Sequence, residues 1–273
     1  MSYTLNLHGQ LFDLSKPCVM GILNATPDSF YAGSRTQTEQ SIIERVHQII
    51  NEGGAIIDVG ACSTRPGSAP VSEAEEMDRM HHALTVITKE IENLKTSQLS
   101  PLNSPAISID TFRPSVARMT VEEFGAHIIN DVSEGSDEMF RMVSRLGVPY
   151  ILMSVQPDLR QTLLAFSQKV QHLRDLGQKD IILDPGFGFG KTLEQNFQLM
   201  NEMEKLQVFD LPLLVGISRK SMIFKTFNCT PAEALNGTTV LNTVSLMKGA
   251  SILRVHDVKA AAECIKLKEA MDT

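Results

Sequence analysis

Polar and charged residues stand directly after short apolar stretches at many places along this 273-residue chain. They are Asn24, Asp58, Asp110, Asn130, Asp131, Ser154, Asp184, Ser218, Arg219, Lys220, Arg254, His256 and Asp257. Any one of them fits the solvated start of a loop. So many together are costly to bury unless they pair with one another or face a ligand. The set is therefore interpreted as a binding or catalytic site assembled from several parts of the chain.

The mixture of charges in this set indicates the chemistry of a ligand. Acceptors for the N–H groups of a planar heterocycle are present at Asp110, Asn130 and Asp184. Lys220 can donate to a ring carbonyl or a ring nitrogen. The cations that can hold an anion are Arg65, Arg254 and His256. A flat nitrogen heterocycle that carries a phosphate-type leaving group fits this mixture.

Other catalytic motifs are absent from the sequence. "DPGFGFGKT" is similar to a phosphate-binding loop, but that motif needs glycine where Pro185 stands. The chain has no H-E-x-x-H zinc motif, and "GIS" around Ser218 is not the G-x-S-x-G elbow of a serine hydrolase.

Short apolar stretches alternate with helix-length amphipathic segments along the chain. The predicted strands cover residues 18–24, 55–60, 106–110, 127–131, 150–154, 180–186, 211–218 and 251–256. Continuous Ile, Val and Leu runs are typical of a parallel sheet covered on both faces. We expect one (β/α)8 barrel domain over residues 1–273, with a doubly wound open sheet as the alternative. In such a barrel the polar strand ends meet at one mouth.

Flanking signals predict several other elements. Residues 3–15 read as an N-terminal β-hairpin whose turn is residues 8–10. Helices are expected over residues 38–53, 71–94, 158–177 and 231–249, the last starting at Pro231. His47, His127 and His172 lie in or beside helices and are interpreted as structural, and His81 and His82 as surface residues.

Bulk composition excludes some classes of protein. A formal net charge of −7 argues against general nucleic-acid binding, which needs a net basic face. No apolar run is long enough to span a membrane, and the start has no signal-peptide pattern. The four cysteines are far apart in the sequence and form no C-x-x-C motif. We therefore expect a cytoplasmic protein with reduced thiols.

Seven motifs occur in order at the ends of predicted strands. They are "MGILNATPDSF", "GAIIDVGACSTRPG", "SIDTFRPSVA", "INDVS", "LDPGFGFGKTLEQN", "LVGISRKS" and "LRVHDV". Together they closely resemble the dihydropteroate synthase family of pterin-binding enzymes, over residues 18 to 258. The order of "DPGFGFGKT", "GISRKS" and "RVHDV" is highly specific to that family.

The resemblance implies an activity. The family joins 6-hydroxymethyl-7,8-dihydropterin diphosphate to p-aminobenzoate, forming dihydropteroate and releasing diphosphate in folate biosynthesis. It implies a (β/α)8 fold, Mg²⁺ as cofactor, a homodimer and inhibition by sulfonamides, which mimic p-aminobenzoate.

The resemblance also assigns residues to each ligand. For the pterin they are Asp110, Asn130, Met153, Asp184, Phe189, Lys220 and Arg254. For the diphosphate they are Thr64, Arg65, Arg254 and His256. For p-aminobenzoate they are Phe30, Phe189, Lys220 and Ser221. Asn24 is the expected metal ligand, and the residues expected to act in catalysis are Asp110, Lys220, Arg254 and His256.

The implied reaction needs no protein nucleophile. A dissociative, SN1-like substitution requires stabilisation of the departing diphosphate and of a cationic dihydropterin ring. Asp110 can stabilise that cation electrostatically, and the aniline nitrogen then attacks. Cys62, which looks at first like a nucleophile beside Arg65, is therefore interpreted as a small neutral loop residue.

Three positions depart from the usual family pattern. Many members have Asp where this chain has Ala32, Gly-Glu where it has Ala61 and Cys62, and His where it has Ser154.

Two other functions stay open beside the synthase. One is a methyltetrahydrofolate:corrinoid methyltransferase, which shares the pterin-binding acidic residues. The other is a pterin-binding paralogue that no longer catalyses.

Overall fold

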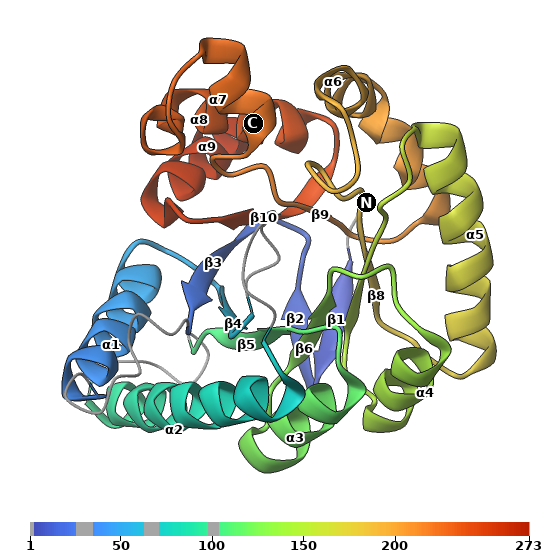
Figure 1. Ribbon diagram of the computed structural model, residues 1–273. Helices are drawn as coiled ribbons and strands as arrows, with labels where there is room; N and C mark the ends of the chain where they lie inside the picture. The colour runs from blue at the N-terminus through green and yellow to red at the C-terminus, as the bar shows by residue number, and fades with distance from the viewer. Residues whose placement is uncertain (1–2, 26–34, 63–70, 98–103, 273) are drawn as a thin grey trace.

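The parallel strands of the described chain close into a barrel. The computed structural model describes residues 3–25, 35–62, 71–97 and 104–272. Around the barrel the strands follow the order β10, β3, β4, β5, β6, β7, β8, β9, with every neighbouring pair parallel (Figure 1). Their bounds are β3 Cys18–Asn24, β4 Ile56–Gly60, β5 Ala106–Asp110, β6 Ile128–Asp131, β7 Tyr150–Met153, β8 Ile181–Asp184, β9 Leu213–Val215 and β10 Ala250–Val255. The predicted (β/α)8 barrel is confirmed, and the open-sheet alternative is wrong.

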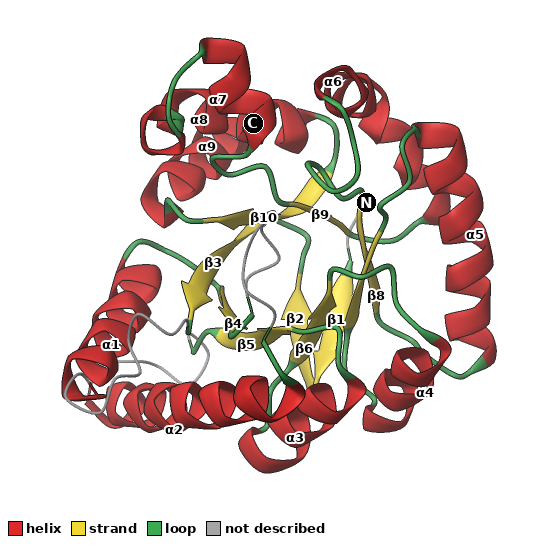
Figure 2. Ribbon diagram, viewed as in Figure 1, coloured by secondary structure: helices red, strands yellow, loops and turns green. Residues whose placement is uncertain are grey.

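Helices cover the outside of the barrel, as Figure 2 shows. Their bounds are α1 Arg35–Asn51, α2 Glu73–Ser97, α3 Pro114–Phe124, α4 Asp137–Leu146, α5 Leu159–Asp175, α6 Leu193–Glu202, α7 Ser221–Phe227, α8 Leu235–Met247 and α9 Val258–Met271. Two 3₁₀ segments, η3 Met203–Phe209 and η4 Pro231–Glu233, complete the set in the described ranges. None of these described helices is long and apolar enough to cross a membrane.

An N-terminal hairpin closes the bottom of the barrel. It pairs β1 Thr4–Leu7 with β2 Gln10–Asp13. The turn is two residues, His8 and Gly9, not the predicted three, because both adopt positive φ (51° and 88°). This left-handed pair matches the twist of the flanking strands, so Gln10 already belongs to β2.

The barrel interior is apolar at its lower end. The inward-facing side chains of this layer are Met20, Ile56, Ala106, Ile128, Ile151, Ile182, Leu214 and Ile252. Leu5, Leu7 and Leu14 of the hairpin segment pack against them from below. Because side chains alternate between the two faces of a strand, the next inward position on each strand lies two residues further on. On five of the eight strands this position is polar, and the residues are Asp58, Ser108, Asn130, Asp184 and Arg254.

Most predicted helices are confirmed, with one correction. Ser72 receives a hydrogen bond from the Glu75 backbone N–H at 3.2 Å at the start of α2, which has three acidic residues in its first turn. The helix predicted over residues 231–249 is interrupted. Pro231 starts the short segment η4, and α8 begins only at Leu235. Thr230 and Glu233 form a capping box at the start of η4, and Ala234, with φ −83° and ψ 9°, ends η4 and precedes α8.

The histidines predicted to be structural have structural partners. His47 Nε2 lies 2.6 Å from Glu90 Oε1, and His172 Nε2 lies 2.7 Å from Asp137 Oδ1. The Nδ1 atom of His127 accepts the Ile107 backbone N–H at 3.0 Å, and burial lowers the pKa of this ring to about 4. Of the adjacent pair, His81 is exposed and His82 is half-buried.

Candidate active site

Asp58 lies at the centre of the polar layer, fully buried on β4. Its Oδ1 accepts the hydroxyl of Ser108 at 2.7 Å, and its Oδ2 accepts Nε of Arg254 at 2.6 Å. The side-chain amide of Asn130 donates to the same carboxylate at 3.2 and 3.4 Å. One carboxylate therefore organises side chains from three other strands, at the depth where the barrel interior changes from apolar to polar.

Arg254, on β10, bridges two carboxylates. Besides its bond to Asp58, its Nη2 donates to Oδ2 of Asp110 at 2.6 Å. Burial acts to lower the pKa of this guanidinium, but Asp58 and Asp110 raise it above its ordinary value, so it stays charged. For Asp110, burial raises the pKa to about 7. The attraction of Arg254 opposes that shift, and the nearby Asp58 adds to it.

A second pair of opposite charges lies across the mouth. Asp184 ends β8, and burial raises the pKa of its carboxyl, with Lys220 as the largest opposing influence. Lys220 stands just before α7, and burial lowers its pKa to about 8. Its ammonium donates to the carbonyl of Phe187 and lies 4.5 Å from the ring centroid of Phe189. The ammonium thus reaches the barrel mouth beside an aromatic face.

The loop after β8 is held close to the barrel by its main chain. Asp184 Oδ1 accepts the N–H of Gly186 at 2.8 Å, and Gly186 has a φ of 72°. A Cβ at this position would lie 1.9 Å from the carbonyl oxygen of Ser154, so only glycine fits here. Lys191 closes the loop by donating to the carbonyls of Ser154, Gly186 and Phe189 at 3.0, 3.0 and 3.3 Å.

Asn130 presents one unused acceptor in this buried layer. Because a carboxylate such as Asp58 only accepts hydrogen bonds, the contact orients the amide with its Nδ2 toward Asp58. The Oδ1 atom is buried and has no hydrogen-bond partner among the residues that the structure describes. A buried polar atom of this kind is costly without a partner, which is consistent with a ligand N–H donor.

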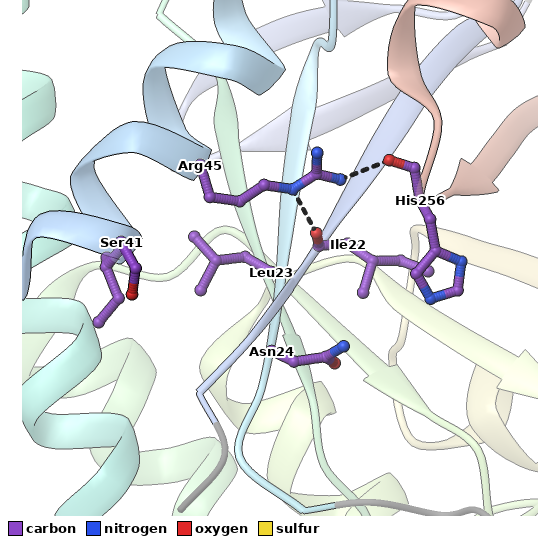
Figure 3. Close-up of a pocket in the computed structure, with 7 residues that line it drawn as sticks. Ile22, Leu23, Asn24, Ser41, Arg45 and His256 are labelled. Carbon is purple, nitrogen blue, oxygen red and sulfur yellow. Dashed lines mark hydrogen bonds between the residues drawn. The ribbon is translucent and has the colours of Figure 1, made fainter. Parts of the chain in front are cut away.

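A pocket lies at the edge of the mouth, between β3, α1 and the end of β10. Its volume is about 270 Å³ and it is lined by Ile22, Leu23, Asn24, Ser41, Ile42, Arg45 and His256 (Figure 3). Asn24 is exposed at the last position of β3. His256 is half-buried, and both its backbone N–H and its Nδ1 lie close to the Ser218 hydroxyl, at 3.2 and 3.1 Å.

Two other residues from the polar strand ends bind each other. Arg219 and Asp257 form a two-bond ion pair, with both contacts at 2.8 Å. This pair joins the loop after β9 to the loop after β10. It also accompanies the left-handed backbone of Arg219, whose φ is 53°. Ser221, the next expected site residue, is half-buried at the first position of α7.

Most of the site residues expected from the sequence are brought to one mouth of the barrel. Those that the structure describes there are Asn24, Asp110, Asn130, Met153, Asp184, Phe189, Lys220, Ser221, Arg254 and His256. Phe30, Thr64, Arg65 and the departing residue Ala32 lie outside the described residues. Cys62 is a free, half-buried cysteine two residues beyond the end of β4.

Two residues that organise the site have no role predicted from the sequence. Asp58 stood among the polar strand ends, and its place two residues above an inward-facing Ile56 was the signal available. Lys191 lies in the "GFGFGKT" segment and received no role after the phosphate-loop motif was rejected. Its three carbonyl acceptors come from two loops, and no local pattern reveals that convergence.

The residues present fit a magnesium ion that arrives with a phosphate group. Magnesium prefers oxygen ligands, keeps several waters and is often held by one or two protein groups together with substrate phosphates. Within the described ranges, no group of three or more His, Cys, Asp or Glu could hold a metal alone. The exposed Asn24 side chain, beside His256 at the rim, offers one oxygen to such an ion.

The geometry combines a largely buried floor with a polar rim that carries Asn24 and His256. The floor offers carboxylates, an unused amide oxygen and an ammonium, which match the alternating donors and acceptors of a flat heterocycle. Because these charges are largely buried, they act more strongly on a bound ligand than they would in water.

Comparisons with known proteins agree with this chemistry. The family model described as "Pterin binding enzyme" matches residues 20–256. The chain is 37% identical to the dihydropteroate synthase of Escherichia coli K12, over 96% of this chain and 94% of that protein. It also resembles the solved Xanthomonas albilineans dihydropteroate synthase with 4-aminobenzoic acid, with a TM-score of 0.86, 31% identity and coverage of 100% of this chain and 99% of that one. The Yersinia pestis enzyme with a pterine-sulfa conjugate gives a TM-score of 0.81, 32% identity and 99% coverage of both chains.

Proposed function

The chain belongs to the dihydropteroate synthase family of pterin-binding enzymes, and from this membership we propose that it joins 6-hydroxymethyl-7,8-dihydropterin diphosphate to p-aminobenzoate. The products are 7,8-dihydropteroate and diphosphate. The observation that carries the proposal is the buried floor in which Arg254 bridges Asp58 and Asp110 beside the unused acceptor of Asn130.

The pterin ring binds in this floor. Asp110, Asn130 and Asp184 accept its N–H groups, and Lys220 donates to its acceptors. Met153, fully buried at the end of β7, lies beneath the ring, and Phe189 and Arg254 lie beside it. The solved Yersinia pestis relative with a pterine-sulfa conjugate supports a pterin as ligand.

The diphosphate points to the rim that carries Asn24 and His256. Arg254 and His256 hold the anion together with Thr64 and Arg65, and Asn24 holds the Mg²⁺. When bound, Mg²⁺ neutralises charge on the leaving diphosphate. The side chains of this rim orient the diphosphate so that its bond to the pterin methylene can break.

p-Aminobenzoate binds on the outer side of the pterin. Ser221, at the start of α7, receives its carboxylate, and Lys220, Phe189 and Phe30 line the aromatic ring. The relative with 4-aminobenzoic acid supports p-aminobenzoate as a ligand. We therefore expect sulfonamides to inhibit by competing with p-aminobenzoate, as the sulfonamide complex of the Yersinia pestis enzyme supports for this family.

The substitution is dissociative. The carbon–oxygen bond to diphosphate breaks first and leaves a delocalised dihydropterin cation, and the aniline nitrogen then attacks that carbon and loses its proton. Asp110 in its ionised form stabilises the cation through space. Its contact with Arg254 holds the carboxylate in place before the charge develops.

One assay distinguishes this function from its competitors. Purified protein is incubated with the pterin diphosphate, labelled p-aminobenzoate and Mg²⁺, and labelled dihydropteroate is measured. Tight pterin binding without product would identify an inactive paralogue. Methyl transfer from methyltetrahydrofolate to a corrinoid would identify a methyltransferase.

The role of Asp110 has its own test, and it has the largest expected effect on turnover. The substitution Asp110→Asn removes the charge and keeps the shape, so single-turnover release of diphosphate should slow about 10²–10³-fold. The measurement is rapid-quench detection of diphosphate. Unchanged release would show that Asp110 does not stabilise the cation.

We also propose a cytoplasmic homodimer. The four cysteines are free in the structure, as expected in a reducing compartment. Exposed apolar side chains gather on α7, α8 and α9, at Phe227, Val240, Met247, Leu267 and Met271. A second copy covering this surface would bury them. Sedimentation of the wild type and of Met247→Glu tests the dimer, since the charge should yield monomers.

A further inference from the structure

Arg45 of α1 reaches the two strand ends that carry Asn24 and His256. Its Nε donates to the carbonyl of Ile22 at 3.0 Å, and its Nη2 donates to the carbonyl of His256 at 2.7 Å. Figure 3 shows the guanidinium between these two carbonyls. A guanidinium holds its donors in a rigid planar fork, so two such bonds set the relative position of their acceptors.

The bridge lies where the sheet ladder between β3 and β10 has ended. The last pair in register is Gly21 with Val255. Ile22 and His256 are the next residues on the two sides, and the His256 N–H is directed to Ser218 instead. Arg45 therefore supplies the connection between the two chain segments at the point where backbone pairing stops.

We propose that Arg45 is a positioning residue for the diphosphate half of the site. This inference rests on the proposed function, because it takes Asn24 and His256 as the groups that face the diphosphate and its metal. Asn24 lies two residues beyond one acceptor carbonyl, and His256 itself provides the other. The third contact of the guanidinium, Nη1 to Oε1 of Gln48 at 2.7 Å, stays within α1.

Loss of the Arg45 bridge should affect the rim that binds the diphosphate but not the floor that binds the pterin. Without Arg45, the ends of β3 and β10 are no longer held together by one side chain, and Asn24 and His256 sample more positions. Binding of diphosphate then has to order them, which weakens that binding. The floor keeps its own contacts among Asp58, Asp110 and Arg254, so the binding of the pterin ring itself is retained.

The experiment compares two ligands that differ only in the anion. Dissociation constants of 6-hydroxymethylpterin and of its diphosphate are measured by fluorescence with Mg²⁺, for the full-length wild type, Arg45→Ala, Arg45→Lys and Gln48→Ala. The diphosphate should bind about tenfold more weakly to Arg45→Ala, the loss expected from a charged hydrogen bond, while the alcohol binds unchanged. Arg45→Lys keeps the charge but not the fork and should show an intermediate loss.

The matched control is Gln48→Ala, which removes the contact of the guanidinium within α1 and leaves both carbonyl bonds in place. It should bind both ligands like the wild type. Equal weakening of both ligands in the Arg45 variants, or no weakening of the diphosphate, would overturn the proposal. If Arg45→Ala does not fold, the same comparison is made with Arg45→Lys.

Failure of the proposed function would look different. A wild type that binds both ligands but forms no dihydropteroate would contradict the synthase activity. The ratio of the two dissociation constants would still report on Arg45 in that case. In an active enzyme, Arg45→Lys should raise KM for the pterin diphosphate more than it lowers kcat.

Discussion

The two ends of the barrel interior differ in chemistry although the same strands build both. At the lower end, Met20, Ile56 and Ile252 pack against hairpin leucines such as Leu5. Asp58 lies two residues after Ile56 on β4, and Arg254 lies two residues after Ile252 on β10. These two side chains form an ion pair. The lower layer stabilises the fold because its apolar side chains are buried. The upper layer holds charges that are costly to desolvate and must pair. The same strands thus stabilise the fold at one end and position the polar side chains of the candidate site at the other.

This difference predicts which property each substitution should change. A change in the lower layer should reduce the free energy of unfolding and leave the site's geometry intact. A change in the upper layer should reduce activity, and it should also reduce stability where it leaves a buried charge without its partner.

The sharpest test of the upper layer is Asp58→Asn. Arg254 would lose one of its two carboxylates, and Asn130 would face a side chain with one acceptor and one donor in place of the acceptor-only carboxylate that orients its amide. We expect a loss of about 3–5 kcal/mol in the free energy of unfolding, as for other buried ion pairs that lose one partner. We also expect kcat/KM for the pterin diphosphate to fall about 100-fold, because the loss of one oriented electrostatic contact typically has this size.

Denaturant unfolding and steady-state kinetics measure the two effects of Asp58→Asn. Ser108→Ala is the matched control, since Ser108 donates to the same carboxylate but carries no charge. It should cost only about 1 kcal/mol. Equal losses of activity in the two variants would contradict a special role for Asp58.

The test of the lower layer is Leu5→Ala. Leu5 is buried beneath the barrel, so the substitution should reduce the free energy of unfolding by about 2–5 kcal/mol. The value of kcat should stay within twofold of the wild type. Leu11→Ala on the same hairpin is the control, because Leu11 is 79% exposed and should change stability by less than about 0.5 kcal/mol. A loss of kcat without a loss of stability would break the proposed division between the two ends.

The pH dependence of the reaction sharpens the picture of the upper layer. Burial raises the pKa of Asp110 to about 7, so the active carboxylate form becomes scarcer below that pH. We expect kcat/KM to fall about tenfold per pH unit below 7. It should decline again above about 8, where Lys220 loses its proton because burial lowers its pKa to about 8. A profile that is flat between pH 5 and 7 would show that the ionised form of Asp110 is not required.

The smallest effect is expected for Cys62→Ser. Cys62 follows the end of β4 but takes part in no step of the proposed reaction. Turnover should stay within twofold of the wild type, as measured by product formation. A loss of several orders of magnitude with intact pterin binding would instead identify Cys62 as a nucleophile.

The order of strands and helices could be read from the sequence because it depends on local patterns. Apolar runs such as residues 106–110 predicted β5 to the residue, and Gly177 and Gly249 marked the ends of helices. The interruption at Ala234 was not predictable, because one periodic pattern covers both η4 and α8 and no glycine or proline marks the break between them.

In the candidate site, too, some features could be predicted from the sequence and others could not. Residue type and position at a strand end were enough to nominate Asp110, Asn130, Asp184, Lys220 and Arg254. Which side chains of a strand face the barrel interior follows from the sequence, because side chains alternate between the two faces of a strand. The tertiary structure alone decided which of them pair: Arg254 with Asp58 and Asp110, Arg219 with Asp257, and Arg45 with the carbonyls of Ile22 and His256. These partners lie 23 to 211 residues apart in the chain, and only the packing of strands and helices in the folded barrel brings their atoms within hydrogen-bonding distance.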